Sequence, residues 1–300
     1  MIFNVGGVSY SVDKKLTKIW EVNSLEKLKK RNSDKNYIID GRERVGKSLF
    51  AIQQMGVIEP EIFNDTETFL SRICFTAEQF NKAAREIKNG VVLFDEAFRG
   101  LSSRAALSKV NKMIVQTLME MGQNNNTTFI ALPSIFLLDI YPAMLRSDML
   151  FHIKEDVKRR NCRTFKIYNR ADKNVIYQLG IRKGWKYSIS SKFSGRFFNK
   201  FPGGEKFEQA YLKKKMEVFT DESKYSQKID ETTYKYKIQR SKLIKFIYEH
   251  PELYNNKKKS HVKTSILLKE VGVDMSSSQI SRILIEENEQ KPAEQPPTPL

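Results

Sequence analysis

The sequence predicts an α/β fold built on a mainly parallel sheet, and three observations point to it. From Asn36 to Ile153, short apolar runs alternate with amphipathic stretches, which is the pattern of strands joined by crossover helices. A glycine-containing loop separates the first apolar run from the first amphipathic stretch. The 300 residues are 40% hydrophobic and 29% charged, the balance of a globular chain that has room for a second module.

Five strands and their connecting helices are expected in this region. The strands are Tyr37–Asp40, Ile73–Phe75, Val91–Asp95, Thr128–Pro133 and Met149–Ile153. The helices lie near 47–55, 77–88 and 107–121, and a short helical turn is expected around 142–146. Thr76 and Gln79 have the spacing of a capping box, and Gly90 follows the expected end of the second helix.

Shorter elements are expected on both sides of this region. Residues 2–12 alternate around two glycines and predict a small hairpin, and residues 24–31 predict a short surface helix. After residue 153, Arg163–Tyr168 and Val175–Leu179 flank a polar turn containing Asp172, which predicts a second hairpin.

The remaining segments set the expected domain limits. Another alternating run occupies Trp185–Ile189, a glycine-containing stretch at 193–204 is the expected hinge, and residues 205–219 predict a basic helix. The expected organisation is an N-terminal hairpin and helix at 1–35, an α/β core at 36–153, a β-hairpin extension at 154–203, a basic helical module at 204–287 and a disordered, proline-containing tail at 288–300.

Several classes of protein are disfavoured by composition. The longest apolar stretch, Phe129–Leu145, contains Pro133, Asp139 and Pro142, so no membrane-spanning segment is expected. Residues 1–12 lack the pattern of a secretory signal, and a cytoplasmic location is expected. Two cysteines and three scattered histidines assemble neither a disulfide framework nor a zinc site.

The net charge of +17 is concentrated after residue 153. That part holds 32 Lys and Arg against 18 Asp and Glu, a net of +14. A basic half beside a nearly neutral one suggests a polyanionic partner, most simply nucleic acid. A solvated basic surface with no such partner is the alternative.

Residues 41–48, GRERVGKS, match the phosphate-binding pattern G-x-x-x-x-G-K-[ST] without departure. The glycines let backbone N–H groups turn toward phosphate oxygens, and the following helix adds its N-terminal dipole. Lys47 would reach the β and γ phosphates and Ser48 would meet Mg²⁺. The expected ATP-binding residues are Gly41, Arg42, Glu43, Arg44, Val45, Gly46, Lys47 and Ser48.

A second motif follows with one strand and one helix between. Val91–Glu96, VVLFDE, is an apolar strand that ends in two carboxylates, where an open parallel sheet places its ligands. Asp95 would hold Mg²⁺ together with Ser48, and Glu96 would act as general base on the attacking water. An ordinary strand end is the alternative. The pair favours hydrolysis over transfer to a small molecule.

With these two motifs, the chain resembles the additional-strand, catalytic-glutamate division of P-loop ATPases, whose members include RecA-, FtsK- and HerA-like proteins. The resemblance covers residues 36–153 and implies a RecA-like core with five strands in the order 5-1-4-3-2. DEAF at 95–98, the arginine after it and the RSDMLFHI ending at 146–153 are similar to FtsK/HerA-type DNA pumps and zonula-occludens-toxin-like ATPases of filamentous phages.

The resemblance also implies a γ-phosphate sensor and an arginine that enters a neighbouring subunit's site. The position matching the sensor is Ser134, where these pumps usually have Gln. Arg146 is the first choice for the catalytic arginine, followed by Arg104 and Arg99.

The C-terminal region resembles a helix-turn-helix or winged-helix module. A helix is expected at 264–271, a turn at Gly272, and a second helix that Ser276 or Ser277 opens. A three-helix protein-interaction module is the alternative. The expected DNA-contacting residues are Lys257, Lys258, Lys259, Ser278, Gln279 and Arg282.

Together these features predict an enzyme that couples ATP hydrolysis, with Mg²⁺, to DNA binding. The first expectation is a homo-oligomeric DNA translocase or packaging motor, of a virus or mobile element. The alternative is an ATP-switched DNA-binding regulator of partition, transposition or replication that does not translocate. A small-molecule kinase is disfavoured by Glu96.

Overall fold

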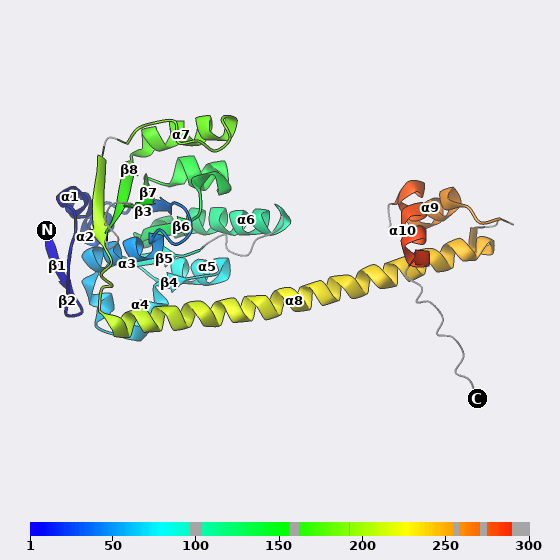
Figure 1. The fold of residues 1–300 in the computed structure, drawn as a ribbon, viewed down its shortest axis with the longest axis horizontal. Coiled ribbons are helices and arrows are strands. Elements are labelled where there is room, and N and C mark those ends of the chain that lie inside the picture. The colour runs from blue at the N-terminus through cyan, green and yellow to red at the C-terminus, as the bar shows by residue number, and fades with distance from the viewer. Residues whose placement is uncertain (97–103, 157–161, 192, 255–257, 271–274, 290–300) are drawn as a thin grey trace. The chain divides into compact units, whose positions relative to one another are not determined.

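The computed structural model describes residues 1–96, 104–156, 162–191, 193–254, 258–270 and 275–289 (Figure 1). These fall into two compact units, Met1–Val218 and Phe219–Leu300. In the described residues, no helix combines the length and the apolar character needed to cross a membrane.

The first unit is a mixed α/β structure around one sheet. Its described strands are β4 (Ile73–Cys74), β5 (Val91–Phe94), β6 (Thr127–Leu132), β3 (Lys35–Asp40), β7 (Met149–Glu155), β8 (Cys162–Tyr168) and β9 (Phe193–Phe198), in that spatial order. The first five are parallel, and β8 and β9 are antiparallel additions at one side. Numbered along the chain, the five parallel strands have the expected order 5-1-4-3-2, which is consistent with a RecA-like core.

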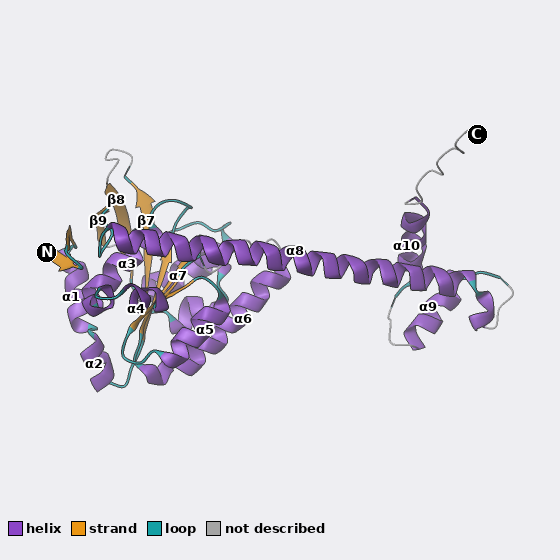
Figure 2. Cartoon of the chain, turned by 90° about the horizontal axis from the view of Figure 1, so that it is seen from below, coloured by secondary structure: helices purple, strands orange, loops and turns teal. Residues whose placement is uncertain are grey.

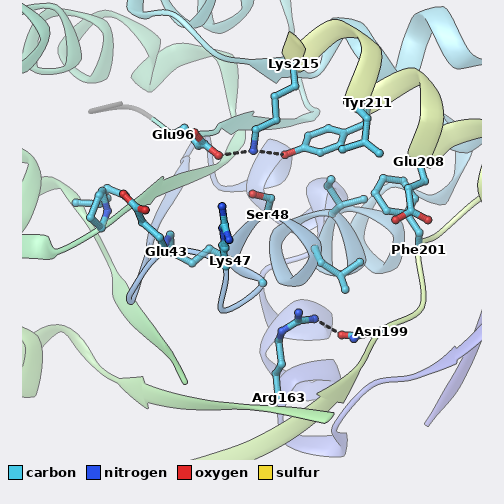
Figure 3. Close-up of a pocket in the computed structure, with 17 residues that line it drawn as sticks. Glu43, Lys47, Ser48, Glu96, Arg163, Asn199, Phe201, Glu208, Tyr211 and Lys215 are labelled. Carbon is cyan, nitrogen blue, oxygen red and sulfur yellow. Dashed lines mark hydrogen bonds and ion pairs between the residues drawn. The ribbon is translucent and has the colours of Figure 1, made fainter. Parts of the chain in front are cut away.

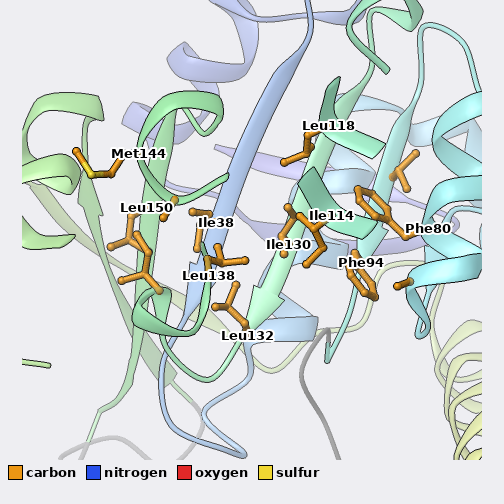
Figure 4. Close-up of a cluster of buried hydrophobic side chains, with 14 of the residues drawn as sticks. Ile38, Phe80, Phe94, Ile114, Leu118, Ile130, Leu132, Leu138, Met144 and Leu150 are labelled. Atoms are coloured by element: carbon orange, nitrogen blue, oxygen red, sulfur yellow. The ribbon is translucent and has the colours of Figure 1, made fainter. Parts of the chain in front are cut away.

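Alternation along the strands creates two buried faces. Ile38, Ile130 and Leu150 share one face and belong to one buried cluster with residues of α5 (Ala77–Glu86) and α6 (Arg104–Glu120), in which Phe80 is stacked on Phe94 (Figure 4). Because helices cover both faces, the central strands are buried along nearly their whole length, as in other parallel sheets (Figure 2).

The opposite face is mainly aromatic. Tyr37 packs against Phe129 and Phe151, and Trp20 of α1 (Lys14–Val22) meets all three rings. Phe50 of α3 (Lys47–Ile58) adds contacts with Phe151, Phe165 and Phe197. The helix that follows the predicted phosphate loop is therefore anchored on three strands, which fixes the position of its N-terminus.

The N-terminal predictions are confirmed, with one addition. Strands β1 (Ile2–Val5) and β2 (Val8–Ser11) form the hairpin, and α2 (Leu25–Lys30) is the short helix. Helix α1 was not predicted from the sequence. Trp20 of α1 is buried and donates a hydrogen bond to Gln54 Oε1 at 3.0 Å. Asp13 caps this helix by accepting from Lys15 N at 2.9 Å.

The second predicted hairpin is wrong. Arg163–Tyr168 does form a strand, β8, but Val175–Leu179 lies inside a helix, α7 (Arg170–Arg182). Asn169 caps this helix, accepting a hydrogen bond from Asp172 N at 2.9 Å, so the polar turn starts a helix rather than reversing a strand. Its buried positions, Lys173, Ile176, Tyr177 and Gly180, follow the helical period.

The antiparallel partner of β8 is β9, which lies in the stretch expected to be a hinge. Gly195 makes room for Phe165, because a β-carbon there would lie 2.5 Å from that ring. Trp185–Ile189 forms no strand. Strands β8 and β9 therefore extend the main sheet, in place of a separate hairpin region.

Helix α8 (Glu205–Glu249) begins where the basic helix was expected and is longer. The sequence places a domain boundary at 203–204, whereas the division between the compact units falls inside α8, after Val218. Phe207 and Tyr211 explain the difference, since both are buried in the first unit, where they contact Phe69 and Phe75.

The second unit is built from the end of α8 together with α9 (His261–Glu270) and α10 (Ser277–Glu289). Its core is a small apolar cluster formed by Ile244, Ile247, Leu268, Ile280 and Leu284. Ser276 opens α10 with a capping box, accepting from Gln279 N at 3.3 Å. No strand is found among the described residues of this unit, and the winged-helix arrangement is not confirmed. Gly272 and the tail from residue 290 lie outside the described residues.

Candidate functional site

The loop between β3 and α3 has the backbone conformation of a phosphate cradle. Gly46 has φ +90° and starts α3, Arg44 has φ +61°, and Gly41 has φ +142°. A β-carbon at Gly41 would lie 2.4 Å from the carbonyl oxygen of Ile153, so this position excludes larger residues. The loop therefore leaves β3 at a close backbone contact and turns directly into the N-terminus of a helix.

The loop's starting point is fixed by Asp40, the last residue of β3 and fully buried. Its carboxylate lies 2.7 Å from His152 Nδ1, and it accepts hydrogen bonds from Ile135 N at 3.1 Å and from the Tyr187 hydroxyl. These contacts tie the first parallel strand to the fifth, β7, to the segment after the fourth, β6, and to the segment after α7. Burial, reinforced by Asp40, raises the pKa of Tyr187 well above its usual range.

Lys47 curls back over the loop. Its Nζ donates to the carbonyl oxygens of Gly41 and Arg42 at 2.8 and 2.7 Å. Burial lowers the pKa of Lys47, and the nearby carboxylates, Asp95 first among them, act in the opposite direction. An ammonium held by two neutral carbonyls can move to a phosphate oxygen, which offers a full negative charge.

Ser48 and Asp95 bring the two motifs together. Ser48 Oγ donates to Asp95 Oδ1 at 2.9 Å, across 47 residues of sequence. Asp95 is 1% exposed, and burial raises its pKa, while Lys215 and hydrogen bonds from Tyr211 and Ser48 lower it. Glu96 follows with φ +52° and donates its backbone N–H to Asp95 Oδ1 at 3.0 Å. The left-handed conformation of Glu96 turns its side chain toward the cavity (Figure 3).

Two residues of α8 complete this side of the site. The Tyr211 hydroxyl donates to Asp95 Oδ2 at 2.6 Å, and Lys215 forms an ion pair with Glu96 (Figure 3). Lys215 Nζ also lies 3.4 Å from the Tyr211 oxygen. Lys214 fastens the same helix turn by donating to the carbonyl oxygens of Leu70 and Ile73 at 2.7 and 2.6 Å.

The sequence reasoning missed these α8 residues. The available signal was their spacing: residues 211 and 215 lie one helical turn apart on the same face. Nothing local to the sequence, however, connects that face to carboxylates more than a hundred residues away.

The motifs border one cavity of about 690 Å³. From the predicted phosphate loop it is lined by Glu43, Arg44, Gly46, Lys47 and Ser48, and from the second motif by Glu96. Gly41, Arg42 and Val45 do not line it, and Val45 is buried beneath the loop at 5% exposure. The remaining lining residues are Leu49, Ile52, Leu132, Pro133, Arg163, Asn199, Phe201, Glu208, Tyr211, Leu212 and Lys215.

Ser134, the predicted sensor, does not line the cavity, although its neighbour Pro133 does. Its hydroxyl instead accepts from Phe136 N at 3.4 Å, at the start of a short 3-10 turn, Ile135–Leu137.

The structure places Arg146 away from the cavity. Its guanidinium forms a bidentate pair with Asp34, at 3.0 and 2.5 Å, and its Nε donates to the Leu118 carbonyl oxygen at 2.9 Å. Asp34 precedes β3 and Arg146 precedes β7, so this pair lies at the amino edge of the parallel sheet, opposite the loop. The side chain of Arg104 and all of Arg99 lie outside the described residues.

The predicted DNA-contacting residues are in the second unit. Lys258 and Lys259 are exposed, as are Ser278, Gln279 and Arg282 on α10, and Lys257 lies outside the described residues. Gln279 has a structural role, since its Oε1 accepts from Ser276 N at 2.9 Å.

Binding of a divalent cation at this site would require further oxygen ligands from a bound phosphate compound and water. Among the described residues, no group of three or more His, Cys, Asp and Glu side chains is arranged to hold a metal ion. Ser48 Oγ and Asp95 Oδ1 instead form a single hydrogen-bonded pair beside the loop. Such a donor set fits Mg²⁺, which takes one or two protein oxygens and completes its shell with phosphate and water.

Comparisons with known proteins add little beyond this geometry. No protein-family model matches the chain, and no curated protein matches it. Among solved structures, the N-terminal domain of zonular occludens toxin from Neisseria meningitidis is similar, with 18% identity and a TM-score of 0.30. The match covers 46% of this chain and 84% of that one.

Proposed function

We propose that this chain binds ATP with Mg²⁺ at Gly41–Ser48 and hydrolyses it. The observation that supports this best is the 2.9 Å hydrogen bond between Ser48 and Asp95. It joins a phosphate-binding sequence to a strand end that also supplies Glu96, and all three residues meet at one end of the parallel strands.

In this proposal each residue has a separate task. Backbone N–H groups of the loop and the N-terminus of α3 receive the phosphates, and Lys47 leaves its two carbonyl partners to bind the β and γ phosphates. Ser48 and Asp95 would hold Mg²⁺, which neutralises charge on the phosphate oxygens. Glu96 accepts a proton from the attacking water. Ser134 is the proposed γ-phosphate sensor, from its place after β6.

We do not assign a catalytic task to Arg146. Arg146 is already held by Asp34 and by a carbonyl oxygen, and removing it would leave Asp34, whose side chain is 8% exposed, without its partner.

The substrate on which hydrolysis acts is proposed to be DNA. Support comes from the net charge of +14 after residue 153 and from the exposed Lys258, Lys259, Ser278 and Arg282 of the helical unit. The working model is a homo-oligomeric motor that moves DNA. An ATP-switched DNA-binding regulator is the second candidate, favoured by the capped helix α10 and its exposed polar face.

Phosphate release in the presence of Mg–ATP tests the enzymatic part. Glu96→Gln should lower the rate by at least about a hundredfold, because it removes the base and keeps the side chain's size. Glu78→Gln, at an exposed position in the first turn of α5, is the matched control and should keep the wild-type rate. A Glu96→Gln variant as fast as wild type would remove Glu96 from the mechanism.

The DNA part is tested separately. Affinity for duplex DNA should fall steeply as salt rises, since phosphate contacts release counterions. The ATPase rate of a motor should increase with DNA length at a constant concentration of base pairs. A length-independent rate with tight binding to one sequence would favour the regulator, and salt-independent binding would exclude both.

A further inference from the structure

The cavity has two chemically different ends. At one end lie Ser48, Glu96 and Lys215. Asp95 does not line the cavity and accepts the hydrogen bond from Ser48. At the other end lie Arg163 and Asn199, and Figure 3 shows this pair on the opposite side of Lys47 from Glu96. The motifs found in the sequence account for the first end only.

Arg163 is positioned by the antiparallel strands added to the sheet. It belongs to β8, where it lies opposite Glu155 of β7 and Phe197 of β9. Its side chain reaches across Gly46: a β-carbon on that glycine would lie 2.7 Å from Arg163 Cδ and 2.8 Å from Nε. The glycine therefore serves two purposes, since it permits the turn of the loop and leaves room for the arginine.

The guanidinium is fixed at its far end as well. Arg163 Nη1 donates to Asn199 Oδ1, immediately after β9. Because the amide oxygen is used in this way, the amide nitrogen of Asn199 keeps its two hydrogens for another acceptor. Leu49 and Ile52 of α3 and Phe201 also line the cavity, so part of its wall is apolar.

A nucleoside triphosphate is an extended molecule, so the position of its γ-phosphate determines which part of it lies beside Arg163. If the γ-phosphate lies between Lys47 and Glu96, the phosphate chain runs along the loop and the nucleoside lies at the opposite end of the cavity. A planar guanidinium in a cavity with a partly apolar wall suits the face of a base, on which arginine stacks well. An amide N–H suits the acceptor nitrogens at a base edge.

We infer that Arg163 and Asn199 form the nucleoside subsite of the proposed ATP site, with Arg163 stacked on the base and Asn199 donating to its edge. The inference rests on the proposed function and adds to it two residues from outside both motifs. It assigns Arg163 to the base and ribose and not to the charge of the phosphates.

Binding of two probes separates these roles. Dissociation constants are measured by calorimetry for Mg–ATP and for Mg–tripolyphosphate, which has the phosphate chain and no nucleoside. Arg163→Ala should weaken ATP binding about tenfold and leave tripolyphosphate binding unchanged. Arg163→Lys, which keeps the charge and loses the plane, should not restore ATP affinity. Asn199→Ala should weaken ATP binding by about fivefold.

Arg196→Ala is the matched control. Arg196 lies on the neighbouring strand β9, pairs with Asp156 at 3.2 Å and does not line the cavity, so its removal should leave both affinities at the wild-type value. If Arg163→Ala does not fold, Asn199→Ala decides the question, because Asn199 is exposed and its replacement leaves no buried gap.

The possible failures are distinct. A wild-type chain that binds neither probe contradicts the proposed function itself. A wild-type chain that binds both, with Arg163→Ala weakening both equally, shows that Arg163 binds phosphate and overturns the nucleoside assignment. Unchanged ATP binding in both Arg163→Ala and Asn199→Ala also overturns it.

Discussion

The two edges of the parallel sheet use charged residues in opposite ways. At the amino edge, Arg146 pairs with Asp34, and Lys35 pairs with Asp148 at 2.8 Å, so each cation has an anion fixed beside it. At the carboxyl edge, Lys47 is held by backbone carbonyls and Glu96 by Lys215 of α8. These two cations at the first edge are paired with anions, whereas the second edge lines a cavity in which a ligand could replace the partners of Lys47 and Glu96.

The largest effect is expected from replacing Lys47 at the carboxyl edge. Lys47→Ala should weaken Mg–ATP binding by about a hundredfold, since charge-assisted bonds to two phosphates are lost. Its thermal unfolding should stay near wild type, because the hydrogen bonds of Lys47 to described residues go to two carbonyl oxygens of its own loop. Calorimetric titration and thermal denaturation together check this. Full ATP affinity in the variant would contradict the role of the loop.

A substitution at the amino edge should lower stability and leave ATP turnover unchanged, the opposite of the result expected for Lys47. Arg146→Ala should lower the free energy of unfolding by about 3 kcal/mol, because it strands a nearly buried carboxylate. ATP turnover per folded molecule should be unchanged. The control is Arg85→Ala, whose pair with Glu120 is largely exposed and should contribute little to stability. Loss of turnover with unchanged stability would instead support Arg146 as the catalytic arginine.

A buried lysine near the amino edge should make the free energy of unfolding depend on pH. Lys173 is fully buried, donates to the carbonyl oxygens of Ala143 and Met144, and burial lowers its pKa to about 7. Between pH 7 and 9 the unfolded chain therefore binds more protons at this residue than the folded one, so the free energy of unfolding should rise with pH.

The contribution of Lys173 is at most about 1.4 kcal/mol per pH unit. Lys173→Met, which keeps an unbranched side chain and removes the ionisable group, should lose that part of the slope. Urea denaturation at pH 7, 8 and 9 provides the measurement. Identical slopes in wild type and variant would show that Lys173 does not titrate in this range.

The smallest effect concerns the cation at the carboxyl edge. Lys215 pairs with Glu96, and its charge lowers the pKa of Asp95, so it occupies the neighbourhood that Mg²⁺ is proposed to enter. Lys215→Met should therefore reduce the Mg²⁺ concentration needed for half-maximal ATPase activity by about threefold. Lys213→Met, an exposed change on the same helix, is the control. An increased Mg²⁺ requirement would contradict competition by Lys215.

The parts of the fold that follow from local sequence were predictable. The loop at Gly41–Ser48 and the strand ending in Asp95 depend on motifs and on apolar periodicity, and they agree with the structure. The order of the five parallel strands was implied by the family resemblance, and it agrees as well. The segment 175–179 was mistaken for a strand because a run of apolar residues there fits both periods. The N-terminal cap formed by Asn169 favours the helix over the strand.

Other parts depend on contacts between distant segments. The glycine at 195 favours a hinge when only the local sequence is considered, whereas pairing with β8 makes this segment the strand β9. Tyr211 and Lys215 gain their importance only when α8 packs beside Asp95 and Glu96. The register of Arg163 across Gly46 likewise requires the folded sheet. The local motifs identified the phosphate loop and the two carboxylates, and the packed structure shows what surrounds them.

The most direct test of the central claim is the nucleotide that remains bound to the Glu96→Gln variant after incubation with Mg–ATP. The protein is separated from free nucleotide and denatured, and the released nucleotide is identified by chromatography. The proposed mechanism predicts stoichiometric ATP, because binding through Gly41–Ser48 is intact and the base is absent. ADP in the variant, or no nucleotide in either variant or wild type, would contradict it.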